Sequence, residues 1–216
     1  MDEPKDYEEK ALQLKKALQA FQSRRLNSTY LDLRQNSEYK NIAYFFFHKL
    51  YGPEDYEFRD TSMQTLHKAM DGRAPSGMIN AVSMVIELHD LSDDLDNRMV
   101  DAMIENGIGA DMNMPQYQSI YRQLDNYDER IGQIELSLKV TRVFYDLSRK
   151  WVVRFSLRTV RGVAHLLGIG KIMDFVYEGY TAFRVIHDIG YFIETVEKRE
   201  KNWHNKIWQA GQDERL

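Results

Sequence analysis

Residues Asn41–Asp60, NIAYFFFHKLYGPEDYEFRD, decide the expected fold because they join an aromatic run to an abrupt break. Apolar and aromatic side chains fall on every side of a helix over residues 42–51, so no rotation turns a polar stripe toward water. Such a helix belongs in a core. Gly52 can supply a left-handed residue at its end, and Pro53 cannot continue it. The stretch therefore predicts a buried helix followed by a sharp corner.

The rest of the 216-residue chain also favours helices. The last of its four prolines is Pro115, so the following residues contain none that would break a helix. Apolar residues recur at helical spacing, and alternating strand-like runs are few. We therefore predict an all-α fold, an antiparallel array or bundle of about six or seven helices, some of them long, in a single domain over residues 1–216.

Capping and breaking residues set the expected helix boundaries. Asn36 or Ser37 is expected to cap the aromatic helix, and Asn113 to cap a helix with Pro115 in its first turn. A break is expected near Gly190, and residues 26–35 are predicted as an irregular connection or a short turn. The other predicted helices span residues 4–25, 58–70, 78–106, 113–148, 151–167 and 171–209.

Composition restricts the classes to which the protein can belong. The absence of cysteine excludes a disulfide framework and thiolate metal sites, and it suits a reducing compartment, so we expect a cytoplasmic protein. The charged N-terminal residues do not resemble a signal peptide, and no run reaches the roughly 18 apolar residues of a membrane span. A net charge of −4 argues against general nucleic-acid affinity.

Acidic residues gather in one part of the chain. Residues 85–129 are rich in Asp and Glu, and Arg98 and Arg122 are their only basic residues. Asp90, Asp93 and Asp94 can share neighbouring faces of one helix, and Asp128 is expected at a similar level on the next. Stacked carboxylates can bind Mg²⁺ or another hard cation. The alternative is a solvated acidic face neutralised by neighbouring arginines, Arg98, Arg122 and Arg130.

Basic residues gather further along, between residues 139 and 171, where Asp146 is the only acidic residue. Such a basic segment can contact an acidic protein partner, a second copy of the chain in a homodimer, phosphates, an anionic membrane surface, or the protein's own acidic helix. We interpret it first as pairing within the molecule or between subunits. The candidate partner-binding residues are Arg149 and Lys150, followed by a helical stripe at i, i+4 and i+7 made of Arg154, Arg158 and Arg161.

The residues around the Gly-Pro break resemble a family signature. Phe45–Asp60 matches the pattern FF-x-x-x-LYGP-x-D-x-x-x-RD of an uncharacterised bacterial family of all-helical proteins, whose function is unassigned. The resemblance implies a compact helical domain and adds no substrate, cofactor or catalytic residue. Physically the signature describes a corner, in which Asp55 can cap the next helix. Arg59 either pairs with its neighbours and the loop carbonyls or holds a small anionic ligand, because its planar guanidinium suits a carboxylate or phosphate.

Motifs for catalysis are missing from the sequence. LHDLSDDLD, residues 88–96, looks like the first aspartate-rich motif of isoprenoid synthases, which hold diphosphate through Mg²⁺. Its order is D-x-x-D-D instead of D-D-x-x-D, and no second motif of this kind follows. No nucleophile elbow, glycine-rich phosphate loop or H-E-x-x-H pair is present. His48, within the aromatic run, is the one histidine whose surroundings suit haem. The sequence thus names no cofactor and anchors no enzyme activity.

Two functional hypotheses remain. The first is a non-catalytic interaction protein that binds a protein partner or itself through the basic helix. The second is a helical bundle, either a ligand-binding protein or an enzyme, with an apolar pocket and a cation on the acidic helix. The second requires Asp90, Asp93 or Asp94 to face inward, whereas the first requires them to face water.

Overall fold

The computed structural model describes residues 4–50, 76–150 and 170–213, and all regular structure in these ranges is helical. This confirms the predicted all-α class. In the same ranges no helix is both long enough and apolar enough to cross a membrane. The α-helices are α1 (Pro4–Thr29), α2 (Leu31–Gln35), α3 (Lys40–Tyr44), α5 (Ser76–Glu105), α6 (Met114–Gln123), α7 (Tyr127–Ser148), α9 (Gly170–Arg184) and α10 (Ile189–Asp213), and Phe45–Leu50 form a π-helix, η1.

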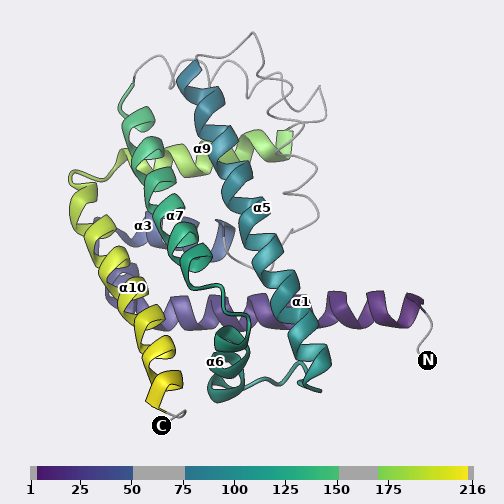
Figure 1. Cartoon of the computed structure of the whole chain (residues 1–216). Helices are drawn as coiled ribbons and strands as arrows, with labels where there is room; N and C mark the ends of the chain where they lie inside the picture. The colour runs from purple at the N-terminus through teal and green to yellow at the C-terminus, as the bar shows by residue number, and fades with distance from the viewer. Residues whose placement is uncertain (1–3, 51–75, 151–169, 214–216) are drawn as a thin grey trace.

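Three long helices stand side by side, with α7 in contact with α5 on one side and α10 on the other (Figure 1). Helices α5 and α7 run in opposite directions, because Arg98 of α5 meets Glu129 of α7 while Ser92 meets Gln133. Helix α1 runs across the lower part of this set, and α9 runs across its upper part (Figure 1). The antiparallel array predicted for the whole chain stays a prediction.

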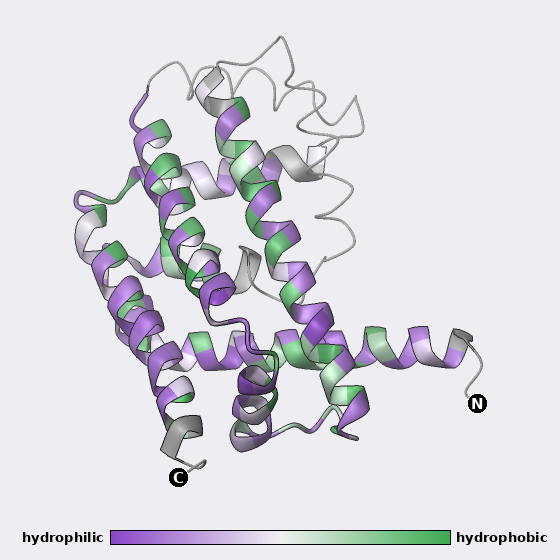
Figure 2. Ribbon diagram, viewed as in Figure 1, coloured by the Kyte–Doolittle hydropathy of each residue, from purple (hydrophilic) through white to green (hydrophobic). Residues whose placement is uncertain are grey.

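The apolar residues of these helices form three clusters. In Figure 2 hydrophobic and hydrophilic residues alternate along α5 and α7, as expected for helices with one buried face. The first cluster joins η1 to α9 and the start of α10 and includes Phe46, Phe183 and Phe192. The second joins α5, α7 and α9. The third joins α1, α5, α6 and α10, and Trp203 and Trp208 pack against it.

Local signals placed several boundaries correctly. Helix α5 closely matches the predicted 78–106 and ends before Gly107, whose φ of 66° is the left-handed conformation expected after a helix. The Asn113 side chain accepts a hydrogen bond from the Gln116 backbone amide at 3.0 Å, and the Gln116 side chain accepts one from the Asn113 amide at 2.9 Å. The predicted cap of α6 is therefore a reciprocal capping box.

Two boundary predictions are wrong. Residues 113–148 form two helices, because the chain turns at Leu124–Asn126 with Asp125 at a φ of 46°, a conformation that Asp tolerates better than most residues. The apolar periodicity continues across this turn, which conceals it. Residues 26–35, predicted to be an irregular connection or a short turn, belong to α1 and α2 except for Tyr30, which lies at the turn between them. Thr29 satisfies its hydroxyl within the helix by donating to the Arg25 carbonyl at 2.9 Å.

The break predicted near Gly190 is confirmed between α9 and α10. There the Gly190 amide donates to the Asp188 side chain at 2.7 Å, which satisfies one free amide at the start of α10.

Within the described part of the aromatic run, Ile42, Ala43 and Phe45–Phe47 are buried as predicted, whereas Tyr44 is 48% exposed. Phe45, Phe46 and Phe47 all lie in the first cluster, and the helix widens into the π-helix at this point. Asn36 accepts hydrogen bonds from the amides of Glu38 and Tyr39, so it caps the turn before α3 instead of α3 itself. The Gly52-Pro53 corner and the helices predicted over 58–70 and 151–167 lie outside the described residues.

Candidate functional site

A cavity of about 180 Å³ lies where the three clusters meet. Each cluster contributes to its wall: Phe46, Phe47 and Phe192 come from the first, Val85 and Leu88 from the second, and Tyr117 and Tyr121 from the third. Residues near the two ends of the described chain and residues in its middle therefore all contribute to the wall. This cavity is the candidate functional site.

The cavity is polar at one end and apolar at the other. Asp96 and Ser92 of α5 face Arg130 and Gln133 of α7 at the polar end, and the Gln133 side chain donates to the Ser92 hydroxyl at 2.9 Å. Moving toward the N-terminus of α5 and the C-terminus of α7, the lining residues become Leu88 and Val85 on α5 and Leu138 and Thr141 on α7. The order follows from the opposite directions of the two helices.

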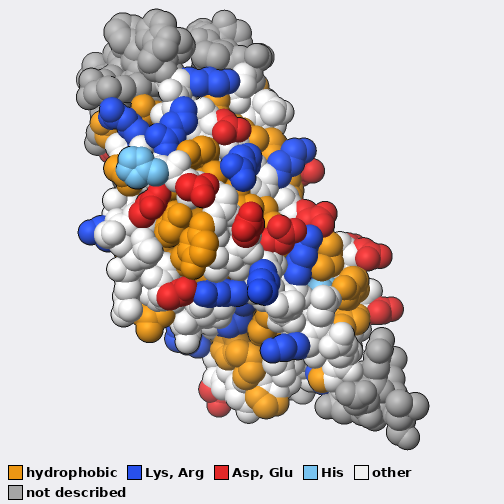
Figure 3. Space-filling model, turned by 90° about the vertical axis from the view of Figure 1, so that its left-hand side faces the viewer, with side chains coloured by type: hydrophobic (Ala, Val, Ile, Leu, Met, Phe, Trp, Pro, Cys, Tyr) orange, Lys and Arg blue, Asp and Glu red, His pale blue; other side chains and the backbone are white. Residues whose placement is uncertain are grey.

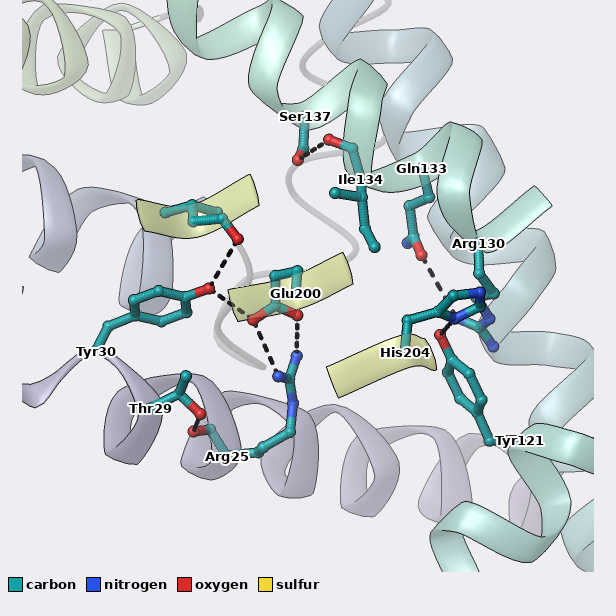
Figure 4. Close-up of polar contacts among 11 residues, drawn as sticks. Arg25, Thr29, Tyr30, Tyr121, Arg130, Gln133, Ile134, Ser137, Glu200 and His204 are labelled. Carbon is teal, nitrogen blue, oxygen red and sulfur yellow. Dashed lines mark hydrogen bonds and ion pairs between the residues drawn. The ribbon is translucent and has the colours of Figure 1, made fainter. Parts of the chain in front are cut away.

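Arg25 and Glu200 both line the cavity. Figure 4 shows how their side chains meet. The Arg25 guanidinium donates to both Glu200 carboxylate oxygens, at 3.0 and 2.7 Å, and the Tyr30 hydroxyl donates to the same carboxylate at 2.7 Å. The guanidinium also lies 4.1 Å from the centre of the Trp203 ring. Burial, reinforced by the Glu200 charge, raises the pKa of Tyr30. The charges of Arg25 and Glu200 thus neutralise each other.

Asp96 is a buried carboxyl group, 7% exposed, at the polar end of the cavity. Its two oxygens accept hydrogen bonds from the side-chain amides of Gln19 at 3.3 Å and Gln22 at 3.0 Å, both on α1. Burial raises the pKa of Asp96, although the Gln22 hydrogen bond and the positive charge of Arg130 oppose the rise. Each carboxyl oxygen of Asp96 accepts from one glutamine only, so lone pairs remain for a further hydrogen bond.

Arg130 is a buried guanidinium, 3% exposed, whose hydrogen bonds are weak. It donates to the Gln133 side chain and to the Leu95 carbonyl at 3.5 Å each, well beyond the usual 2.9–3.0 Å. Its Nε has no hydrogen-bond partner in the described structure. The guanidinium lies 4.7 Å from the centre of the Tyr121 ring, a cation–π contact. Most of its five donors remain available.

His204 lies beside this guanidinium and is fully buried (Figure 4). Its Nδ1 and the Tyr121 hydroxyl are joined by a hydrogen bond of 3.0 Å, and its ring packs 4.4 Å from that of Tyr127. Burial and the Arg130 charge lower the pKa of His204 to about 4. The imidazole is therefore neutral at pH 7 and adds no second positive charge to the site.

The four candidate metal ligands on the acidic segment do not converge. Asp90 and Asp128 are exposed, Asp93 pairs with Lys15 of α1, and Arg98 bridges Asp94 and Glu129 at 2.7 and 2.6 Å. Within the described ranges, no group of three or more metal-ligating side chains is placed to hold an ion. Arg98 and Arg130 were both predicted to neutralise the acidic face. Arg98 does so by pairing with Asp94 and Glu129 at the surface, whereas Arg130 is buried.

The predicted partner-binding residues are only partly described. Arg149 and Lys150 are exposed at the end of α7, where the Arg149 guanidinium donates to the Tyr145 hydroxyl at 3.1 Å. Lys150 follows it at the end of the described range. Arg59, Arg154, Arg158 and Arg161 lie outside the described residues.

Sequence reasoning missed Arg25, Asp96 and Glu200 as parts of a site. A signal existed for Asp96, because it falls at helical spacing with the buried Leu88, Met99 and Met103. A carboxylate on an otherwise buried stripe needs a partner inside the protein. The surrounding aspartates, which do face water, concealed this signal.

Comparisons with known proteins give one assignment. No curated protein and no solved structure matches the chain. One family model matches residues 2–214, nearly the whole chain, and the protein therefore belongs to that family, which is described as a domain of unknown function, DUF8198.

Proposed function

We propose that the protein binds a small organic molecule in the cavity between α1, α5, α7 and α10. The observation that carries the proposal is the wall itself, which is mainly apolar and aromatic but holds the buried polar groups of Asp96 and Arg130 at one end. Ligand sites typically combine an apolar enclosure with a few polar groups that fix the orientation of the ligand. The cavity has both properties.

The state of Arg130 supports this proposal. Buried polar atoms normally have hydrogen-bond partners, and a buried charge is normally paired. Arg130 instead has two hydrogen bonds of 3.5 Å and an Nε without a partner among the described residues. A bound molecule with an acceptor group would complete these interactions.

A cavity-filling substitution tests the proposal. Ser137 lines the cavity on α7, and Ser137→Leu replaces one oxygen by three carbons there. The matched control is Ser119→Leu, the same change at an exposed position of α6. The melting temperature is measured with each member of a panel of small acids, amines, amino acids and sugars. A molecule that binds only the folded protein raises the melting temperature by mass action.

We expect the stabilisation to be lost in Ser137→Leu and retained in Ser119→Leu. If no member of the panel stabilised the wild-type protein, or if one stabilised Ser137→Leu equally, the proposal would be wrong.

A second candidate function is binding of an acidic protein, or of a second copy of the chain, through the basic segment. On the face drawn in Figure 3, basic and acidic side chains are interspersed. Exposed pairs such as Arg199–Asp32 and Lys201–Glu135 occur in the described structure. By contrast, none of the exposed Lys139, Arg142, Arg149 and Lys150 of α7 and its C-terminal end forms an ion pair with another described residue.

The acidic helix uses other cations. Asp93 pairs with Lys15 and Asp94 with Arg98, so these carboxylates are neutralised without the basic segment. The four exposed cations of α7 and its C-terminal end therefore favour a partner outside the described helices, and this observation supports the second candidate.

A further inference from the structure

Two opposite charges face the polar end of the cavity without meeting. Asp96 accepts hydrogen bonds from Gln19 and Gln22, while Arg130 donates to Gln133 and the Leu95 carbonyl. No ion pair joins Asp96 to Arg130 in the described structure, yet the charge of Arg130 acts on the Asp96 carboxyl. A single molecule between them would meet an anion on one side and a cation on the other.

The neighbouring charged pair does not compete for this molecule. Arg25 and Glu200 neutralise each other through two hydrogen bonds, and the Tyr30 hydroxyl occupies a further site on Glu200. The charges open to a ligand are therefore those of Asp96 and Arg130. A purely anionic ligand would leave Asp96 unmatched, and a purely cationic one would leave Arg130 unmatched, each at the cost of a buried unpaired charge.

The remainder of the cavity is suited to an apolar group of the ligand. Beyond the polar end the apolar side chains of the wall include Val85, Leu88, Leu138, Phe46 and Phe192. Burying a hydrocarbon side chain there is favourable, because each methylene group is removed from water. The volume of about 180 Å³ suits a molecule of the size of a single amino acid.

We infer that the ligand is a free α-amino acid with an apolar side chain, held through its carboxylate by Arg130 and through its ammonium group by Asp96. The guanidinium supplies the planar donors that suit a carboxylate, and the Asp96 oxygens have lone pairs beyond those used by the two glutamines. The apolar side chain occupies the end lined by Leu88, Leu138 and Phe192. This assignment rests on the proposed function and names its ligand class.

The test uses four probes that differ in one feature each. They are L-leucine, 4-methylpentanoate (which lacks the amino group), 3-methylbutylamine (which lacks the carboxylate) and glycine (which lacks the side chain). Calorimetric titration of the full-length protein at pH 7 should give the highest affinity for L-leucine. Each of the other three should bind at least about tenfold more weakly, since each loses one charge-assisted or apolar contact.

Variants then assign each contact. Asp96→Asn should weaken L-leucine by about tenfold or more and leave 4-methylpentanoate nearly unchanged. Arg130→Met should weaken both carboxylates by about tenfold or more and leave 3-methylbutylamine nearly unchanged. Circular dichroism checks folding, and if Arg130→Met does not fold, the Asp96→Asn comparison decides by itself. An Asp96→Asn variant that weakened L-leucine and 4-methylpentanoate equally would overturn the assignment.

The two proposals fail in different ways. If L-leucine does not bind, but another molecule binds the wild-type protein and not Ser137→Leu, the amino-acid assignment is wrong and the cavity remains the site. If L-leucine binds Ser137→Leu as tightly as the wild-type protein, the cavity itself is not the site.

Discussion

Arg25 of α1 and Glu200 of α10 are 175 residues apart in the chain and are joined by two hydrogen bonds of 3.0 and 2.7 Å. Both side chains are only 12% exposed. Their contact ties the helix that crosses the lower part of the molecule to the last helix (Figure 1) and forms part of the cavity wall. Burial alone would lower the pKa of Arg25, but the Glu200 carboxylate outweighs it and the net change is a rise.

Removing the charge of Glu200 should be costly. Glu200→Gln leaves the Arg25 guanidinium buried beside a neutral amide, and we expect a loss of about 3 kcal/mol in the free energy of unfolding. The matched control is Glu197→Gln, one turn earlier on α10, where the carboxylate is 44% exposed and pairs with Lys201. That change should cost less than about 0.5 kcal/mol. Urea denaturation measures both, and equal losses would show that the Arg25–Glu200 pair adds no stability of its own.

Two helical glycines should respond to alanine in opposite directions. A Cβ at Gly179 of α9 would lie 2.7 Å from the Phe45 ring, so Gly179→Ala should destabilise by about 1–3 kcal/mol through overpacking. A Cβ at Gly132 of α7 would meet nothing within 4 Å. Gly132→Ala should therefore stabilise by about 0.5–1 kcal/mol, the difference in helix propensity. A denaturation midpoint of Gly179→Ala that rose together with that of Gly132→Ala would contradict the packing of Phe45 on α9.

His204 should make stability fall in mild acid. Its pKa is about 4 in the folded protein against 6.5 ordinarily, because it is buried and lies near the positive charge of Arg130 on α7. Its ring also faces Tyr127 of α7 and Tyr121 of α6. The unfolded chain therefore binds the proton first, and stability is lost as pH falls from about 6.5 toward 4, by at most about 3 kcal/mol.

His204→Asn should flatten this part of the stability profile, measured by urea denaturation at each pH. His187→Asn, at an exposed position between α9 and α10, is the control. If both variants kept the wild-type pH dependence, His204 would not be its source.

Asp96 should act in the opposite sense. Its pKa is raised above 3.8 in the folded protein, so between 3.8 and the raised value the native state binds more protons than the unfolded chain. By linkage, its contribution to stability is complete below 3.8 and is lost as pH rises through this window. Asn carries no such proton, so the stability of Asp96→Asn relative to the wild type should increase as pH rises. Asp90→Asn, at an exposed position of α5, is the control, and a pH-independent difference for Asp96→Asn would refute the prediction.

The basic segment gives a prediction about assembly. Reversing Arg154, Arg158 and Arg161 to glutamate should lower stability or self-association if the stripe pairs within the molecule or across a dimer. The effect should depend on salt, because screening acts over about 8–10 Å at moderate ionic strength. Thermal melts and light scattering at low and moderate salt measure it. A triple variant that behaves as the wild type in both experiments, but loses an acidic partner, would favour external binding instead.

The sequence by itself determined the features that depend on neighbours along the chain. The all-α class, the extent of α5, the capping box at Asn113 and the break before Gly190 all follow from periodicity or from hydrogen bonds spanning a few residues. The same local signals failed at Asp125, because apolar spacing continued across a turn that only the left-handed backbone reveals.

Only the tertiary structure decided which polar residues form a site. Asp90, Asp94 and Asp96 look alike in sequence, yet the first two face water and the third lies in the cavity with Gln19 and Gln22. The difference arises because helix rotation is set by packing against α1 and α7, which lie far away in the chain. A buried charge is stabilised by partners that arrive from other helices, and no local pattern specifies which ones they are.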